Sequence, residues 1–215
     1  MNVKMRDKIY EAYTKISLEK EKAPTSVYRF CKKIEIEESE FYKHFSSLEH
    51  VANEIFCQFF KNAIDLIQKE KGYASKMPQE KLLSFYYTFF EVLLLNRTYV
   101  LFALHSGKNP MEKTATLKSF RSEFKKFVTV LIQDGNALKQ SKLSQHPEGI
   151  FSEAAWLQLV FLLKFWMEDT SENFEKTDMA IEKSVRTAFD LFDNTPFDSV
   201  IDFGKFLWKE KFNMA

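Results

Sequence analysis

Apolar side chains recur along most of the chain at the three- and four-residue spacing of amphipathic helices. Ile9, Ala12, Tyr13 and Ile16 carry this spacing between residues 3 and 21. The pattern returns near 27–33, 38–45, 48–71, 82–95, 111–133, 150–168 and 175–193, and a short amphipathic segment follows at 197–212. Glycine and proline fall almost entirely between these stretches, where they readily end helices. No alternating apolar–polar run bounded by turn residues appears, so the pattern predicts an all-α fold.

Two short helices joined by a tight turn are predicted between residues 25 and 45. Thr25 or Ser26 can cap the first helix, whose inner face includes Phe30. The second helix places Phe41 and Phe45 inward at i, i+4 spacing. Ser46 or Ser47 can cap the helix that follows. In a helix-turn-helix the first helix braces the second, which offers its N-terminal face to the major groove of DNA.

The residues Ser26-Val27, Phe30-Cys31, Ile36 and Phe41-Tyr42-Lys43-His44-Phe45 resemble the headpiece of the TetR family of bacterial repressors, over about residues 5–60. The resemblance implies a headpiece at 1–46 and a helical ligand-binding and dimerisation domain at 47–215. It also implies a ligand-responsive transcriptional regulator that binds duplex DNA as a dimer. Carried over by position, the DNA-binding residues are Ser26, Lys33, Glu37, Glu38, Tyr42, Lys43 and His44.

The headpiece departs from the family pattern in its charge and in its turn. Glu35 stands where the family usually has a glycine, which predicts a less usual turn at some conformational cost. Four basic residues face five acidic ones between residues 25 and 50, and carboxylates weaken binding to phosphate. The net charge of the whole chain is only +1, so it supplies no general attraction to nucleic acid. The alternative hypothesis is a TetR-fold protein that has lost DNA binding. Such a protein would bind a lipid or isoprenoid-like apolar ligand, or a membrane or protein partner through 197–212.

The 23 phenylalanines predict an aromatic-rich interior or a cavity lined with rings. Residues 82–105 mix large apolar side chains with a few polar ends, as ligand pockets do. An apolar or aromatic small molecule fits this composition better than a charged one. For each residue taken singly, packed core explains the composition better than a ligand site does. The expected ligand-binding residues are Phe85, Tyr86, Phe89, Phe90, Arg97, Tyr99, His105, Phe120, Phe124 and Phe127.

The stretches 150–168 and 175–193 are apolar around more of their circumference than one amphipathic face requires. The family resemblance implies that these last two long helices form a homodimer interface, and the core of a single subunit is the alternative. The expected interface residues are Trp156, Val160, Leu163, Ile181, Val185 and Phe189.

Little in the chain indicates catalysis. It has no glycine-rich phosphate loop, no His-Glu-x-x-His and no Cys-x-x-Cys, so we expect neither an enzyme nor a metal or cofactor. Cys31 and Cys57 lie on apolar faces and are expected to be buried thiols. The charged N-terminus lacks the apolar core of a signal peptide. The run 154–167 is shorter than the roughly 18–20 residues of a membrane span. These features predict a cytoplasmic protein.

Overall fold

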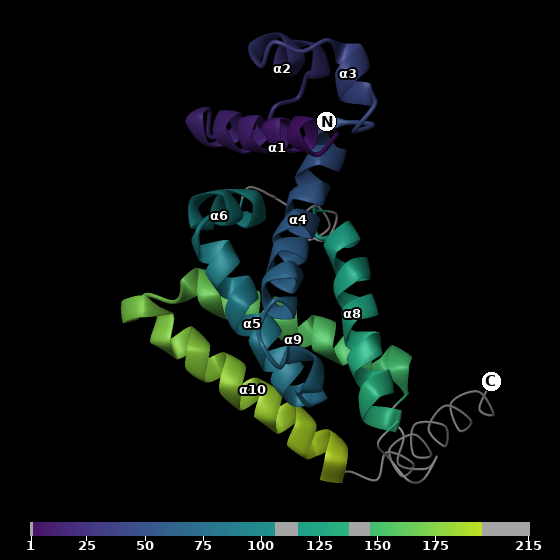
Figure 1. Ribbon diagram of the computed structural model, residues 1–215. Coiled ribbons are helices and arrows are strands. Elements are labelled where there is room, and N and C mark those ends of the chain that lie inside the picture. Colours follow the sequence, from purple (N-terminus) through teal and green to yellow (C-terminus); the bar gives the residue numbers. More distant parts are fainter. Residues whose placement is uncertain (1, 106–115, 138–146, 195–215) are drawn as a thin grey trace, which may run out of the picture. The chain divides into compact units, whose positions relative to one another are not determined.

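The computed structural model describes residues 2–105, 116–137 and 147–194, and within them every regular element is a helix (Figure 1). The helices are α1 (Asn2–Glu19), α2 (Val27–Lys33), α3 (Glu38–Tyr42), α4 (Leu48–Gln68), η1 (Tyr73–Ser75), α5 (Pro78–Leu94), α6 (Arg97–His105), α8 (Lys118–Ala137), α9 (Glu148–Glu168), η3 (Glu172–Phe174) and α10 (Glu175–Asn194). The all-α prediction is confirmed. The amphipathic segment expected at 197–212 lies outside the described residues.

The chain divides into two compact units. The first contains residues 1–71 and 85–124, and the second contains residues 72–84 and 125–215. Helices α5 and α8 therefore contribute residues to both units. The predicted boundary at residue 46 separates a DNA-binding headpiece from a ligand-binding and dimerisation domain. It divides the chain by function and not by packing, and it stays a prediction.

Stacked phenylalanine rings fill the core of the first unit. Phe85 lies 5.3 Å from Phe89 between ring centroids, and Phe89 lies 5.1 Å from Phe120. Phe60 of α4 joins this cluster at 5.6 Å from Phe85, and Phe124 lies 5.5 Å from Phe85. These distances are those of favourable aromatic pairs, so the rings bind α4, α5 and α8 residues into one core.

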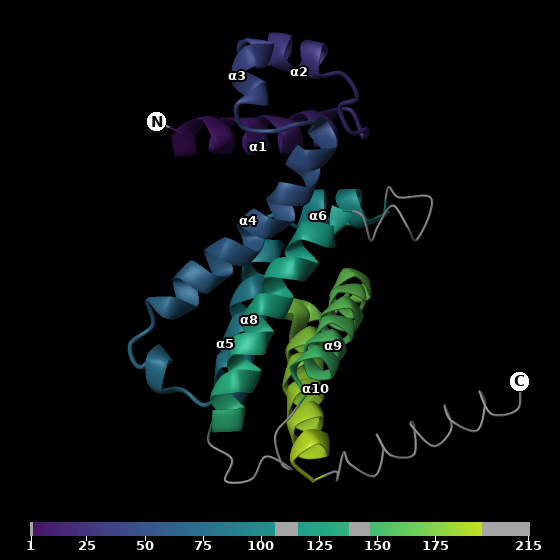
Figure 2. The same ribbon diagram turned by 90° about the vertical axis from the view of Figure 1, so that its right-hand side faces the viewer.

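The helix α1 packs against α4 and α6 in the same unit (Figure 2). Three of the four positions that the helical spacing selected, Ile9, Tyr13 and Ile16, are buried, whereas Ala12 is half-buried. Cys31 of α2 and Cys57 of α4 are buried free thiols, as expected. Burial raises the pKa of the Cys57 thiol to about 12, so this thiol stays protonated and unreactive.

In the second unit α9 and α10 lie side by side (Figures 1 and 2). Asp169, at the C-terminal end of α9, ties the two helices together. Its Oδ1 accepts hydrogen bonds from the Ser171 N–H and hydroxyl at 2.8 and 2.6 Å, and its Oδ2 accepts from the Thr177 N–H and hydroxyl at 2.9 and 2.6 Å. Burial alone would raise the pKa of Asp169, but these four hydrogen bonds outweigh it and lower the pKa to about 2. The carboxylate is therefore charged at neutral pH and caps the start of α10.

One described helix, α9, is long and apolar enough to cross a membrane by length and composition. Helices α5 and α6 reach the same criterion only when the bent pair is counted as one span. Part of α9 is buried inside the protein, including Leu159, Leu162 and Trp166. Core helices of soluble proteins have this composition as well, so the finding is weak evidence for a membrane.

Candidate DNA-binding surface and ligand cavity

The predicted helix-turn-helix is formed by α2 and α3. Ser26 caps α2, because its Oγ accepts a hydrogen bond from the Arg29 N–H at 3.3 Å. The turn that follows has the form of a Schellman motif, in which the Ile36 N–H bonds to the Cys31 carbonyl at 3.1 Å. Glu35 occupies the left-handed position of this motif with φ 56°. The predicted strain at Glu35 is confirmed, since this conformation suits glycine and costs other residues energy.

The helix α3 is a short element that ends at Tyr42, three residues before the predicted end. Glu37 stands at its N-cap without a side-chain hydrogen bond to the helix. Phe41 and Phe45 are buried and hold α3 against the rest of the unit. Of the two serines considered for the next helix, Ser47 is the cap of α4, and its Oγ accepts from the His50 N–H at 3.0 Å.

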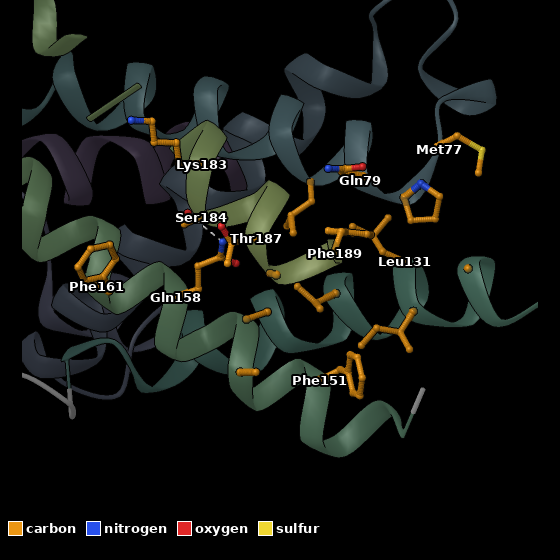
Figure 3. A pocket seen from close by; sticks show the side chains of 18 of the residues that line it. Met77, Gln79, Leu131, Phe151, Gln158, Phe161, Lys183, Ser184, Thr187 and Phe189 are labelled. Carbon is orange, nitrogen blue, oxygen red and sulfur yellow. Dashed lines mark hydrogen bonds between the residues drawn. The ribbon is translucent and has the colours of Figure 1, made fainter. Parts of the chain in front are cut away.

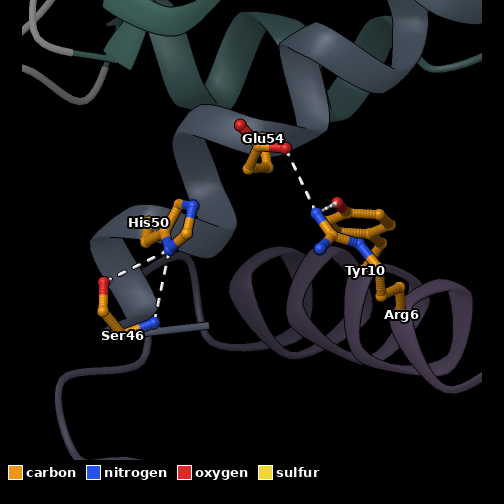
Figure 4. A network of polar contacts seen from close by, with 5 residues as sticks. All are labelled: Arg6, Tyr10, Ser46, His50 and Glu54. Atoms are coloured by element: carbon orange, nitrogen blue, oxygen red, sulfur yellow. Dashed lines mark hydrogen bonds and ion pairs between the residues drawn. The ribbon is translucent and has the colours of Figure 1, made fainter. Parts of the chain in front are cut away.

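A polar network fixes α1 and the junction between α3 and α4 (Figure 4). The Arg6 guanidinium donates to Glu54 Oε2 at 3.2 Å and to the Tyr10 hydroxyl at 2.9 Å. It also lies over the Phe45 ring, 4.7 Å from the ring centroid, which is the geometry of a cation–π contact. His50 Nδ1 accepts from the Ser46 N–H at 3.2 Å on the other side of the junction. These contacts couple the orientation of the headpiece to α4.

Carboxylates of the headpiece contact two of the predicted DNA-binding cations, Lys33 and Lys43, and also contact His44. The Lys33 ammonium donates to Glu19 Oε2 at 3.0 Å, and the Lys43 ammonium donates to Glu40 Oε2 at 2.6 Å. Oε1 of the same Glu40 lies 3.3 Å from His44 Nε2. The hydrogen bond from Lys43 is the main reason why the pKa of Glu40 is lowered. A DNA phosphate would compete with these carboxylates for Lys33, Lys43 and His44.

The other predicted DNA-binding residues differ in their exposure. The Tyr42 side chain is 53% exposed and can reach a partner, and Glu37 is also exposed. Ser26 and Glu38 are half-buried. The His44 side chain is only 4% exposed, so contact with phosphate would need it to move.

Two cations of α2 were not among the predicted residues. Arg29 and Lys32 are exposed, and in the part of the chain that the structure describes their side chains make no ion pair or hydrogen bond. They are free to meet phosphate without displacing a carboxylate. The helical pattern does not reveal where Glu19 of α1 lies, so it could not show that this carboxylate pairs with Lys33 rather than with Arg29 or Lys32.

Most of the predicted ligand-binding residues lie in packed core. Phe85, Tyr86, Phe89, Phe90, Tyr99, Phe120 and Phe124 are buried. Burial raises the pKa of the Tyr86 and Tyr99 hydroxyls. Arg97 and Phe127 are half-buried, and His105 is exposed with its Nδ1 2.9 Å from the Leu101 carbonyl. A ligand among these rings would have to separate them, and their role in binding remains a prediction.

A cavity of about 860 Å³ lies within the second unit (Figure 3). The lining comes from the start of α5, the end of α8, and α9 and α10, and none of the predicted ligand-binding residues belongs to it. The lining residues are Met77, Pro78, Gln79, Leu82, Val128, Leu131, Ile132, Gly135, Phe151, Ala154, Ala155, Gln158, Phe161, Ala180, Lys183, Ser184, Thr187, Ala188 and Phe189. Gln158 Nε2 donates to Ser184 Oγ at 3.0 Å and forms a polar point in a largely apolar wall. This volume and the largely apolar lining suit an apolar small molecule.

The predicted dimer residues divide between core and surface. Trp156, Leu163, Ile181 and Val185 are buried within the subunit, whereas Val160 is exposed and Phe189 is half-buried at the cavity. An exposed apolar stripe runs along α9 through Leu157, Val160 and Phe161, at i, i+3 and i+4. Leu157 and Phe161 are 68% and 55% exposed, so this stripe presents apolar surface that a partner could cover. The homodimer remains a prediction.

The comparisons with known proteins agree with this architecture. Residues 81–207, more than half of the chain, match the family described as tetracyclin repressor-like, C-terminal domain. The chain therefore belongs to the TetR family of transcriptional regulators, as the headpiece resemblance indicated.

Two solved structures are similar. A protein from Shewanella sp. PV-4, assigned to the TetR family of transcription regulators, has 14% identity and a TM-score of 0.52, over 88% of this chain and 96% of that one. The TetR-family transcriptional regulator PfmR from Thermus thermophilus has 16% identity and a TM-score of 0.47, over 83% of this chain and 97% of that one. At this identity the Shewanella structure supports the fold alone. No curated protein matches the chain significantly.

Proposed function

We propose that this chain is a transcriptional regulator that binds duplex DNA as a homodimer and responds to an apolar or aromatic small molecule. The observation that carries the proposal is the helix-turn-helix of α2 and α3, capped at Ser26 and followed by the capped helix α4, in a chain of the TetR family. We place the regulator in the cytoplasm, and the proposal includes no enzymatic step.

The contacts with DNA would come from the exposed cations of the headpiece. Arg29 and Lys32 supply positive charge that no described carboxylate neutralises, and Tyr42 supplies an exposed hydroxyl. Lys33 and Lys43 join them after exchanging Glu19 and Glu40 for phosphate. Because each exchange gives up an existing ion pair, we expect weaker binding than four free cations would give.

The response to a ligand would be allosteric. A molecule bound in the helical domain favours one tilt of α4 and so sets the spacing of the two headpieces in the dimer. The cavity of the second unit supports an effector site by its volume and apolar lining. The exposed stripe Leu157, Val160 and Phe161 supports self-association through α9.

The test is the fluorescence anisotropy of a random duplex titrated with protein across a series of low salt concentrations. We expect the wild type to bind and Glu40→Gln to bind roughly three- to tenfold more tightly, with a salt slope larger by about one phosphate contact. Glu11→Gln is the matched control. It removes the same charge from an exposed position of α1 that makes no ion pair with the described residues, and it should bind as the wild type does.

A second function is favoured by the paired cations of the headpiece. One outcome is that the wild type fails to bind DNA while Glu37→Lys/Glu38→Lys binds it. This result would mean that the headpiece is folded and that its acidic side chains prevent binding. The protein would then be a TetR-fold binder of a lipid or isoprenoid-like apolar ligand. Native mass spectrometry of the purified protein would detect such a ligand as a defined added mass.

A further inference from the structure

The cavity of the second unit is elongated along the helix pair α9 and α10 (Figure 3). Its lining on α9 runs from Phe151 to Phe161, and its lining on α10 runs from Ala180 to Phe189. At the rise of an α-helix these two stretches are about 15 Å and about 14 Å long. A cavity of this length, with a volume of about 860 Å³, has room for an extended apolar chain.

Polar groups of the α9 and α10 lining gather at one end of the cavity. The connection between these helices is short, so they run antiparallel and the end of α9 lies beside the start of α10. Gln158 Nε2 donates to Ser184 Oγ at 3.0 Å and joins the helices on this side. Lys183 precedes Ser184, and Figure 3 shows it on the same side as Gln158. The lining at the other end is apolar and includes Leu131, Phe151 and Phe189.

The polar end of the cavity carries one positive charge. Lys183 is the only charged residue among the described lining residues, and its side chain is exposed. Within the described ranges its ammonium makes no ion pair or hydrogen bond. The remaining polar lining residues are uncharged: Gln79, Gln158, Ser184 and Thr187. Because the ammonium lies in water, it can pair with an anion there without the cost of burying a charge.

We propose that the effector bound in this cavity is an aliphatic carboxylate of the fatty-acid class. Its chain lies along α9 and α10 towards the apolar end, and its carboxylate pairs with Lys183 at the polar end. The inference rests on the proposed effector site and narrows its ligand to an apolar chain with a single anionic head. Burial of the chain supplies most of the binding free energy, and the single ammonium of Lys183 matches a monoanion better than a phosphate monoester. A cationic head would be repelled.

Equilibrium dialysis of radiolabelled dodecanoate against the full chain measures this binding directly and needs no DNA. We expect Lys183→Gln to weaken dodecanoate binding about three- to fivefold, which is the contribution of a well-formed exposed ion pair. The same variant should bind radiolabelled dodecan-1-ol as the wild type does, which also shows that it is folded. Added salt should weaken dodecanoate binding by the wild type more than by Lys183→Gln.

Lys176→Gln is the matched control for Lys183→Gln. Lys176 is also an exposed cation of α10, but it does not line the cavity. The control variant should therefore bind both ligands as the wild type does. An equal loss of dodecanoate binding in the two variants would overturn the inference, because net charge and not the position of Lys183 would explain it.

Thr187→Trp tests where the chain of the ligand lies. Thr187 is an exposed lining residue, so a larger side chain fills space in the cavity without entering the buried core. We expect both ligands to bind roughly tenfold more weakly. Dodecanoate binding that neither Lys183→Gln nor Thr187→Trp changes would overturn the inference, because the carboxylate would then bind elsewhere.

The two ligands separate failure of this inference from failure of the proposed function. Wild type that binds dodecan-1-ol but not dodecanoate would overturn the fatty-acid class and leave an apolar effector site in place. Binding of neither ligand would overturn the inference and would also count against the effector site. DNA binding is measured separately by anisotropy, so its absence would leave the result of the dialysis unchanged.

Discussion

Replacing Glu35 with glycine should stabilise the headpiece. Glu35 has φ 56° in the turn between α2 and α3, and a non-glycine residue in this conformation costs roughly 1–2 kcal/mol. Glycine removes that cost but adds about 0.4–1 kcal/mol of conformational freedom to the unfolded chain. The difference predicts a gain of about 0.5–1 kcal/mol in the free energy of unfolding. For a chain of this size the gain corresponds to a rise in Tm of about 1–4 °C.

Glu35→Gln is the control for this prediction, because it removes the same charge and keeps the left-handed strain. Thermal unfolding followed by circular dichroism gives Tm, and amide exchange of the peptide that contains Ile36 reports the turn itself. The Ile36 N–H bonds to the Cys31 carbonyl, so a relaxed turn should slow its exchange by about two- to fivefold. The reasoning fails if Glu35→Gly proves no more stable than Glu35→Gln.

The other predictions concern Asp169, the ring cluster and the exposed stripe. Asp169→Asn should lower the free energy of unfolding by about 2 kcal/mol, because the pKa of Asp169 is about 2 in the folded protein against an ordinary 3.8. This contribution is present above pH 4 and lost as pH falls from about 4 to about 2, so urea unfolding should show the wild type and variant converging at the acid end. Phe89→Ala should cost about 3–5 kcal/mol if Phe89 is packed core, and an unchanged unfolding midpoint would instead favour its predicted role in a ligand site. Leu157→Glu should weaken a homodimer by about 2 kcal/mol or more in light-scattering measurements, whereas the same change at the exposed Leu95 should not; an unaffected dimer would exclude the α9 stripe as its interface.

Local sequence chemistry was sufficient for the helices of the headpiece. The spacing of Phe30, Phe41 and Phe45 selected residues that are buried in the structure. A hydroxyl side chain before a helix caps it through contacts only three residues away, so Ser26 and Ser47 could be anticipated, with Thr25 and Ser46 as alternatives. The strain at Glu35 was expected from the family resemblance, which places a glycine at this position, and it too arises from local backbone geometry. Each of these features depends on interactions within a few residues of chain.

The roles of charged side chains needed more than local pattern. The contact of Glu40 with Lys43 and His44 spans three and four residues on one helix face, and helical spacing alone could have revealed it. Glu19 reaches Lys33 from a different helix, and this pair exists only because α1 packs near α2. That Arg29 and Lys32 have no such partner among the described residues can be recognised only after the packing is known.

Tertiary structure alone decided which apolar residues form core, cavity or exposed surface. The composition of 82–105 is equally compatible with packed rings and with a ring-lined pocket, because both need large apolar side chains at helical spacing. The cavity instead lies among residues such as Leu131, Gln158 and Thr187, which share no motif and come from helices far apart in the sequence. The same holds for α9, where Trp156 is buried and the adjacent Leu157 is exposed. Hydrophobicity determines which residues are stabilised by burial. The packing of helices that are far apart in the sequence determines which of these residues are buried.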